Sequence, residues 1–482
     1  MKQGESRRSF LKHSVAATIA ATTAAMNMES AAPPPRTKRP NIVLYLADQW
    51  RWDFLGVNKL NASVRTPNLD ALAERGTNFT HTVCNQPVCG PSRSTLFTSR
   101  YATDAGVWHN GLPLNKTLPT LAGELRKAGY SANLIGKWHL AIESEKDGGG
   151  PGFVKPEDRG GFLDLWEGAN ALEHTSHPYE GTIWDRDGKP ISYKDQYRVD
   201  FLTDRAERFL RSPEAKEKPF FLFLSQLEPH QQNDMGQPIG PNGSRERYKN
   251  SHVPPDLRAL PGTWQAQLPD YYGCCEAIDT SVGRLRHILE EEHLADNTLF
   301  VFMSDHGCHF MTRNAEYKRS THNSSLRVPL LFDGPGFEGG RELSQLAGII
   351  DIAPTLLEAA GVPVPPSWKG RSLLPLVTSA EARKTWVNEQ YIQISESMTG
   401  RAIRTPDWTY CVADLTGNTR EPAAASYHEY QMYDQRNDPA ELVNLSGRAD
   451  YRKQADELRD RLLARMKEAG EPAEIERAKL YP

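Results

Sequence analysis

Four short runs typical of buried strands, each followed by polar residues, constrain the fold of this 482-residue chain more than any other feature of the sequence. Short, largely apolar runs of this kind are typical of strands that are buried on both faces of a parallel sheet. Stretches with apolar residues at helical spacing lie between them. This alternation predicts an α/β fold, in which helices sandwich a large, mainly parallel sheet. The runs cover residues 42–47, 131–135, 220–225 and 298–303.

Polar residues follow each predicted strand at its carboxyl end, the edge at which open α/β sheets bind ligands. Two carboxylates, one amide oxygen and one imidazole nitrogen come from Asp48, Gln49, Asp305 and His306. Each residue alone could be a turn or helix-cap residue. Together they form a mainly oxygen donor set, which suits a hard divalent cation such as Ca²⁺ or Mg²⁺ and leaves Mn²⁺ open.

Cys89 is a candidate nucleophile because of the helix that is expected to begin beside it. Pro91 is suited to the first position of a helix, and the thiol would then lie where backbone N–H groups and the helix dipole favour negative charge. A cysteine that stands by itself is more often a small buried apolar residue. Here the surrounding motif, Cys-Gly-Pro-Ser-Arg followed by Leu-Phe-Thr-Ser-Arg, argues against that alternative.

This motif resembles the signature of the type I, formylglycine-dependent sulfatases of the alkaline-phosphatase superfamily. The resemblance extends from Asn41 to a Tyr-Asp-x-x-x-Asp-Pro element at residues 433–439. It implies an alkaline-phosphatase-like fold and a sulfuric ester hydrolase in which Cys89 is converted to formylglycine (3-oxoalanine), whose hydrate is the nucleophile. It also implies one divalent metal, most often Ca²⁺, held by Asp48, Gln49, Cys89, Asp305 and His306.

The same resemblance assigns roles to five basic residues. Arg93 and Lys137 would hold the formylglycine, and His139 would help to remove a proton from its hydrate. His230 and Lys318 would contact the sulfate and the bridging oxygen, one of them assisting departure of the alcohol. Preorganised positive charge of this kind is what a reaction at an anionic tetrahedral group requires.

The substrate is less constrained than the chemistry, and three alternatives remain. We expect a sulfated carbohydrate, since an export signal and long loops such as residues 233–263 accompany the motifs. The Asp-Gln and Asp-His pairs also occur in related phosphonate monoester hydrolases, so hydrolysis of phosphonate monoesters or phosphate diesters is the alternative. A catalytically silent glycan-binding protein is the third reading, against which the intact site residues count. Side chains that could contact a sugar, each with an equal alternative at the surface, are His174, His177, His322 and Arg401.

The N-terminus predicts export from a bacterial cytoplasm. Paired arginines in Ser6–Lys12 precede a mildly apolar Ala/Thr/Val run, which is typical of a twin-arginine signal. We expect this signal to cover residues 1–32 and to lead, through the twin-arginine translocase, to the periplasm or the medium. A separate formylglycine-generating enzyme would be needed to mature Cys89.

Two domains are expected after the signal, because a chain of this length usually divides. The catalytic domain would cover residues 38–378, and a smaller domain of antiparallel sheet plus helix would cover 379–482. The net charge of −4 does not indicate nucleic acid as a partner, and no later segment is apolar enough for a stable membrane span. The six cysteines do not suggest a disulfide scaffold.

Overall fold

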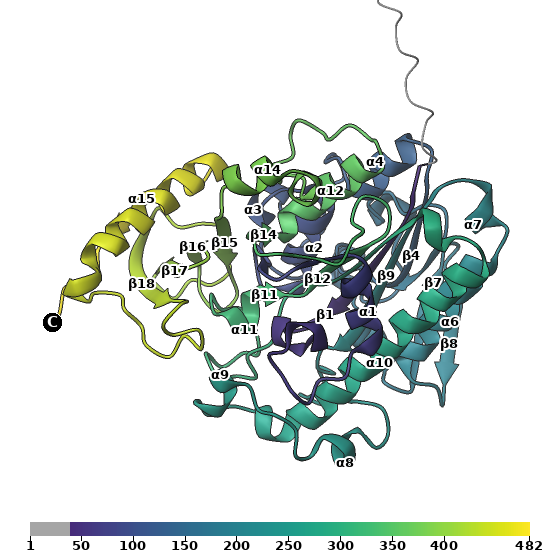
Figure 1. Cartoon of the computed structure of the whole chain (residues 1–482), viewed down its shortest axis with the longest axis horizontal. Coiled ribbons are helices and arrows are strands. Elements are labelled where there is room, and N and C mark those ends of the chain that lie inside the picture. Colours follow the sequence, from purple (N-terminus) through teal and green to yellow (C-terminus); the bar gives the residue numbers. More distant parts are fainter. Residues whose placement is uncertain (1–38) are drawn as a thin grey trace, which may run out of the picture. The chain divides into compact units, whose positions relative to one another are not determined.

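The computed structural model describes residues 39–482, which form one compact unit (Figure 1). The predicted export signal, residues 1–32, lies outside the described residues. Among the described helices, none is long and apolar enough to cross a membrane. All six cysteines are buried and free.

An eleven-stranded sheet forms the centre of the fold. Its five central strands run parallel in the order β10-β1-β9-β4-β5, and four of them are the runs identified in the sequence. Their bounds are Thr298–Ser304, Asn41–Asp48, Phe220–Pro229, Ser131–Lys137 and Trp166–Ala169. The predicted mainly parallel sheet is therefore confirmed for this central part.

The flanks of the sheet make it mixed rather than parallel throughout. β12 pairs antiparallel with β10 and β2, and β7 pairs antiparallel with β5, β6 and β8, whereas β13 is parallel to β2. These outer strands are short or half-exposed, so they lack the apolar runs that mark the centre. They are β12 (Leu330–Asp333), β2 (Thr77–Phe79), β13 (Arg341–Leu343), β7 (Glu180–Asp185), β6 (Ser176–His177) and β8 (Pro190–Lys194).

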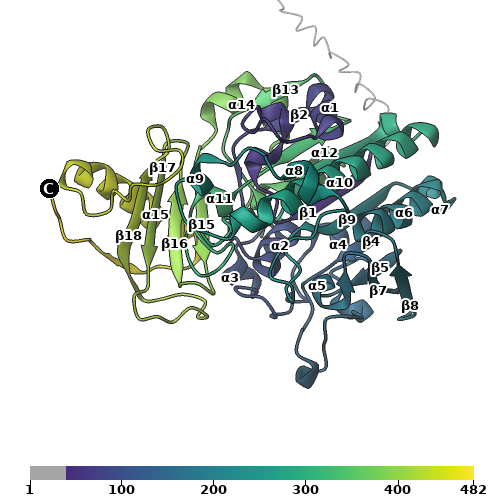
Figure 2. The same ribbon diagram turned by 90° about the horizontal axis from the view of Figure 1, so that it is seen from below.

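Helices cover both faces of the sheet, as Figure 2 shows from below. Alternate residues of β1 enter two separate cores: Leu44 packs in the same core as α2, α4 and α12, and Tyr45 in the same core as α1, α6 and α10. This is the pattern of a strand that is buried on both faces. The helices are α2 (Cys89–Thr98), α4 (Leu121–Lys127), α12 (Ile352–Ala359), α1 (Pro67–Arg75), α6 (Arg198–Arg211) and α10 (Trp264–Glu291).

A second sheet of five strands occupies the C-terminal part, in the order β15-β16-β17-β18-β19. Its pairs are antiparallel except for β18 with β19. Helix α15 (Arg452–Ala469) packs Leu458 and Leu462 against Ile403 and Tyr410 of this sheet. The sheet-plus-helix arrangement follows the prediction, whereas the domain boundary near residue 379 stays a prediction. The strands are Gln390–Ile394, Gly400–Arg404, Trp408–Ala413, Ser426–Asp434 and Glu474–Glu476.

The segment 233–263, expected as a long loop, contains two short helices, α8 (Ser244–Tyr248) and α9 (Pro255–Arg258). Prolines and glycines obscured them, because Pro255 begins α9 and Gly243 precedes α8. Two further short helices are α5 (Leu172–Thr175) and α11 (Asn323–Leu326).

Candidate active site

The carboxyl ends of four central strands meet at one edge of the sheet, as parallel pairing requires. Asp48 ends β1 and Lys137 ends β4, while His230 and Asp305 follow β9 and β10 directly. The register aligns these ends, because Ala47 pairs with Ser304 and Asp48 with Pro229. The structure therefore brings the strand-end residues that the sequence singled out to one place.

Cys89 is the first residue of α2, so the helix begins two residues earlier than expected. Pro91 occupies its third position instead of its first. The first N–H groups of a helix have no partner within it, so a proline costs no hydrogen bond there. The earlier start is fixed by the Ser92 N–H, which donates to the Val88 carbonyl at 2.8 Å, and by the Gly90 N–H, which donates to Asn110 Oδ1 at 2.9 Å.

The Cys89 sulfur lies among the predicted metal-binding and basic residues. Its Sγ is 2.8 Å from Lys318 Nζ, 3.3 Å from His306 Nε2 and 3.6 Å from Asp48 Oδ1. Burial alone would raise the pKa of the Cys89 thiol, but the positive charges of Lys137 and Lys318 lower it well below its usual range. The surroundings of position 89 therefore favour an anion.

Arg93 ties the two predicted carboxylate ligands together. Its guanidinium is fully buried and donates to Asp305 Oδ2 and to Asp48 Oδ2, both at 3.2 Å. It also donates to Ser225 Oγ at 2.8 Å and to the Lys137 carbonyl at 2.9 Å. A buried guanidinium needs such a set of acceptors, and here the set fixes both carboxylates beside Cys89.

The donor set at this place fits a divalent cation. One ligand atom from each of Asp48, Cys89, Asp305 and His306 lies within 4.8 Å of the others. Gln49 is the remaining expected ligand: its backbone is left-handed at φ 72°, and its Nε2 donates to Cys308 Sγ at 3.2 Å. The Gln49 Oε1 atom is buried without a hydrogen-bond partner, a costly state for which a metal ligand would account.

Lys137 and His139 lie beside two acidic residues that sequence reasoning missed. Lys137 Nζ is 2.8 Å from both Asp48 Oδ2 and Glu173 Oε1, and His139 Nε2 is 2.6 Å from Glu143 Oε1. Burial would lower the pKa of Lys137, but these carboxylates and Cys89 raise it well above its ordinary value. No local sequence signal marked Glu143 or Glu173, because each is placed by the fold.

His230 and Lys318 meet on the other side of Cys89. His230 Nε2 lies 3.4 Å from Lys318 Nζ and 3.2 Å from the hydroxyl of Tyr317, a further residue that the sequence did not single out. Burial would lower the pKa of Lys318, whereas Cys89 raises it, so the side chain stays charged. The structure thus brings all the predicted catalytic residues around Cys89, whereas their roles stay predictions.

Two of the residues expected to contact a sugar, Arg401 and His322, instead bind other groups of the protein, so we correct this expectation. Arg401 is buried and donates to Glu471 Oε2 at 2.8 Å and to the Gly400 carbonyl at 2.7 Å. His322 is buried between Ser320 and Tyr433. Both residues are held by the C-terminal part of the chain, where the sequence predicted either a sugar contact or a surface position.

The other two expected sugar contacts remain predictions. His174 is exposed on α5, directly after Glu173. His177 Nε2 lies 2.8 Å from Asp234 Oδ2 and is half-exposed.

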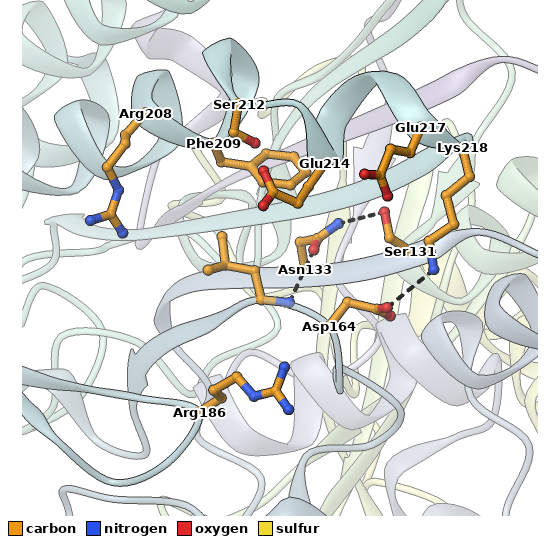
Figure 3. Close-up of a pocket in the computed structure, with 11 residues that line it drawn as sticks. Ser131, Asn133, Asp164, Arg186, Arg208, Phe209, Ser212, Glu214, Glu217 and Lys218 are labelled. Carbon is orange, nitrogen blue, oxygen red and sulfur yellow. Dashed lines mark hydrogen bonds and ion pairs between the residues drawn. The ribbon is translucent and has the colours of Figure 1, made fainter.

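A cavity of about 610 Å³ opens at the opposite edge of the sheet (Figure 3). Ser131 and Asn133, which line it, lie at the amino end of β4, whereas Lys137 lies at the carboxyl end. Lys218 Nζ donates to Asp164 Oδ1 across this cavity at 3.2 Å. None of the predicted site residues lines it, so it is separate from the candidate active site.

Comparison with known protein families places the chain among the sulfatases. A family model described as Sulfatase matches residues 40–362. A second model, described as N-sulphoglucosamine sulphohydrolase, C-terminal, matches residues 315–468. Together they span the central sheet and most of the C-terminal sheet.

Individual relatives agree with this assignment. An ulvan-active sulfatase of Formosa agariphila is 29% identical over 453 residues, which cover 90% of this chain and 82% of the relative. An N-acetylglucosamine-6-O-sulfatase of Bacteroides thetaiotaomicron is 26% identical over 529 residues, which cover 92% of this chain and 89% of the relative. The solved structure of BT4656, in complex with its substrate D-glucosamine-2-N,6-O-disulfate, has a TM-score of 0.72 at 25% identity and covers 90% of this chain and 98% of that one. The chain therefore belongs to the type I sulfatase family of the alkaline-phosphatase superfamily and is a sulfatase.

Proposed function

We propose that this sulfatase releases inorganic sulfate from a sulfated carbohydrate, using a formylglycine made from Cys89 and one divalent cation. The observation that carries the proposal is the position of Cys89 Sγ, which is 2.8 Å from Lys318 Nζ and within 4.8 Å of ligand atoms from two carboxylates and an imidazole. Carbohydrate as the substrate class is supported by the relative named for N-acetylglucosamine 6-O-sulfate and by the glucosamine disulfate complex.

The cation would be held by Asp48, Gln49, residue 89, Asp305 and His306. Three of the donors are carboxylate or amide oxygens, which favours Ca²⁺ over softer metals. A bound divalent cation supplies charge that stabilises negative oxygens of the sulfate in the transition state. The unpartnered Gln49 Oε1 is the feature of this chain that supports a cation here most directly.

Formylglycine, when hydrated, supplies one hydroxyl that attacks sulfur and a second hydroxyl whose deprotonation allows the aldehyde to reform as sulfate leaves. Arg93 orients Asp48 and Asp305, and Lys137, which donates to Asp48, would help Arg93 to hold the formylglycine. His139, with its Nε2 against Glu143, accepts a proton from the hydrate.

Departure of the alcohol depends on Lys318 and His230. The two side chains meet at 3.4 Å beside Cys89, so either can donate a proton to the bridging oxygen as the sulfur–oxygen bond breaks. Tyr317, whose hydroxyl lies 3.2 Å from His230 Nε2, would hold that imidazole in place.

A second candidate function is hydrolysis of phosphonate monoesters or phosphate diesters. The observation that favours it is Gln49, which supplies a neutral amide in place of a second carboxylate after β1. A less negative donor set changes the net charge that the site presents to its substrate. The relative turnover of sulfate and phosphonate esters separates the two candidates.

Export and maturation belong to the same proposal. The paired arginines near the N-terminus support transport by the twin-arginine translocase to the periplasm or the medium. The Cys-Gly-Pro-Ser-Arg motif supports conversion of Cys89 by a formylglycine-generating enzyme.

Co-expression with a formylglycine-generating enzyme tests this function. After peptide mass analysis of Cys89, sulfate release is measured on a panel of sulfated sugars and alcohol release on matched phosphonate monoesters, with Cys89→Ala as the inactive control. We expect release of sulfate from at least one sugar and none by Cys89→Ala. Converted protein that turns over phosphonate esters but no sulfate ester would move the assignment to the second candidate.

A further inference from the structure

Glu396 connects the C-terminal sheet to two segments of the candidate active site. It lies in the loop between β15 and β16, two strands that lie side by side in the C-terminal sheet (Figures 1 and 2). Its side chain is only 10% exposed. Its own backbone is left-handed, at φ 66°, and its N–H donates to the Thr419 carbonyl at 2.7 Å.

The first connection leads to Lys318. Glu396 Oε2 accepts a hydrogen bond from Arg319 Nε at 2.7 Å and lies 2.5 Å from Arg319 Nη2. The next residue, Ser397, donates from its Oγ to the Arg319 carbonyl at 2.6 Å. The β15–β16 loop therefore holds both the side chain and the backbone of the residue that follows Lys318.

Arg319 needs this support because its backbone is left-handed, at φ 66°. A residue with a side chain adopts this conformation only at a cost, and the conformation persists where the surroundings fix it. Relaxation of Arg319 would rotate the peptide that carries Lys318. Since Lys318 Nζ lies 2.8 Å from Cys89 Sγ, such a rotation would displace the ammonium from the nucleophile position.

The second connection leads to Cys89 itself. Glu396 Oε1 accepts the Asn110 N–H at 2.6 Å, and Asn110 Oδ1 accepts the N–H of Gly90, the neighbour of Cys89, at 2.9 Å. Ser395 supports the same segment, because its Oγ accepts from Gln86 Nε2 at 2.7 Å. Glu396 thus binds Arg319, the neighbour of Lys318, through Oε2, and binds Asn110, which holds the neighbour of Cys89, through Oε1.

We propose that Glu396 is a positioning residue that fixes Lys318 opposite the nucleophile, so that the C-terminal sheet completes the catalytic site. This inference rests on the proposed function, in which Lys318 assists departure of the alcohol. Glu396 touches neither Cys89 nor Lys318 and acts through Arg319 and Asn110. Its loss should therefore lower kcat with little change in KM.

A double-mutant cycle tests this role on whichever sulfated sugar the converted wild-type protein hydrolyses. The variants are Glu396→Ala, Lys318→Ala and the double variant, and each is assayed for conversion of Cys89, thermal unfolding and kcat/KM. We expect Glu396→Ala to lower kcat/KM about tenfold or more, the scale of a misplaced general acid. When Lys318 is already alanine, the additional Glu396→Ala change should lower kcat/KM by less than about twofold, because a residue that acts only through Lys318 has no effect once Lys318 is absent.

Two further variants separate positioning from folding. Glu396→Gln keeps an oxygen for the Asn110 N–H but loses the charge that binds Arg319. Its kcat/KM should therefore lie between the values of wild type and of Glu396→Ala. Glu389→Gln is the matched control, since Glu389 is 9% exposed and pairs with Arg461 and Arg465 in the same C-terminal part. It should lower thermal stability and leave kcat/KM within about twofold.

The outcomes are distinguishable. Losses from Glu396→Ala and Lys318→Ala that multiply in the double variant would overturn the positioning role while leaving the sulfatase proposal intact. An unchanged kcat/KM in Glu396→Ala would do the same. Converted wild-type protein that releases no sulfate from any substrate would overturn the proposed function, and the role of Glu396 with it.

Discussion

At the scale of single residues, the two oxygens of Asp48 face different partners. Oδ2 accepts from Lys137 Nζ at 2.8 Å and from Arg93 at 3.2 Å, whereas Oδ1 faces Cys89 Sγ and His306 Nε2. Burial and Cys89 would raise the pKa of Asp48, but Lys137 and the two nearby histidines lower it to about 2. Asp48 is therefore ionised, with one oxygen held by protein cations and the other directed to the metal-binding group.

The side-chain oxygen of Gln49, which is buried without a hydrogen-bond partner, can be tested as a metal ligand. If its unpartnered Oε1 is a metal ligand, Gln49→Ala should weaken binding of Ca²⁺ by about tenfold or more, since even indirect support of a metal ligand is typically worth this much. Calorimetric titration of metal-free protein with Ca²⁺ measures this without turnover.

The matched control for this titration is Gln267→Ala, which removes a buried glutamine of α10 whose Nε2 donates to the Gly236 carbonyl. It should bind Ca²⁺ as wild type does. Equal Ca²⁺ affinity of Gln49→Ala and wild type would show that the amide is not a ligand.

At the scale of elements, the close pairing of β4 with β9 sets the positions of Lys137 and Arg93. Gly136 has φ 100° and lies opposite Ser225, whose Oγ binds Arg93. A Cβ at Gly136 would lie 2.0 Å from the Ser225 carbonyl oxygen. The strands can approach this closely only because residue 136 has no side chain.

Gly136→Ala should therefore destabilise the fold by about 3 kcal/mol or more, through strain and displacement of β9 together. Gly129→Ala is the matched control: its φ is 94°, but nothing lies within 4 Å of an added Cβ. It should cost only the conformational term of about 1–2 kcal/mol. Denaturant unfolding measures the free energy of unfolding of both variants. An equal decrease in the two would show that the close approach of β4 and β9 does not require a glycine at position 136.

The elements also show what a sequence of this kind can reveal. Four of the five central strands were predictable because burial on both faces leaves a continuous apolar run. The longer helices were predictable because their apolar residues recur at helical spacing. β2, with only three residues, carries no such signal and is placed by pairing with Leu331, more than 250 residues away. The strand-end residues were predictable for the same reason as the strands. Glu173, Tyr317 and Glu396 were not, because a carboxylate or phenol in a short helix or a loop gives no sign of the partner that the fold brings to it.

At the scale of the whole molecule, buried histidines make stability depend on pH. Burial lowers the pKa of His309 to about 4, and burial together with Arg327 lowers that of His81 to about 4. Burial also lowers the pKa of His322 well below its ordinary value. The unfolded chain binds protons at these residues near pH 6.5, where the folded protein does not. The stability that these three histidines contribute is therefore full above about pH 6.5 and falls as the pH decreases toward 4.

His322→Gln tests this dependence. Each neutral buried histidine contributes a slope of up to about 1.4 kcal/mol per pH unit to the free energy of unfolding. Denaturant unfolding at several pH values between 7 and 5 should show a shallower slope for the variant than for wild type. An unchanged slope would mean that His322 is protonated in the folded protein. Because His322 contacts Ser320 and Tyr433, sulfate release at pH 7 should survive in this variant.

Residue 89, once converted to formylglycine, is the proposed nucleophile of the sulfatase reaction. The most direct measurement compares the fraction of Cys89 converted to formylglycine, determined by peptide mass, with the rate of sulfate release across preparations matured to different extents. We expect a rate proportional to the converted fraction, with no release at zero conversion. The control Cys411→Ala, whose thiol is buried in the C-terminal sheet, should follow the same proportionality. Sulfate release by unconverted protein, or by Cys89→Ala, at the rate of matured wild type would contradict it.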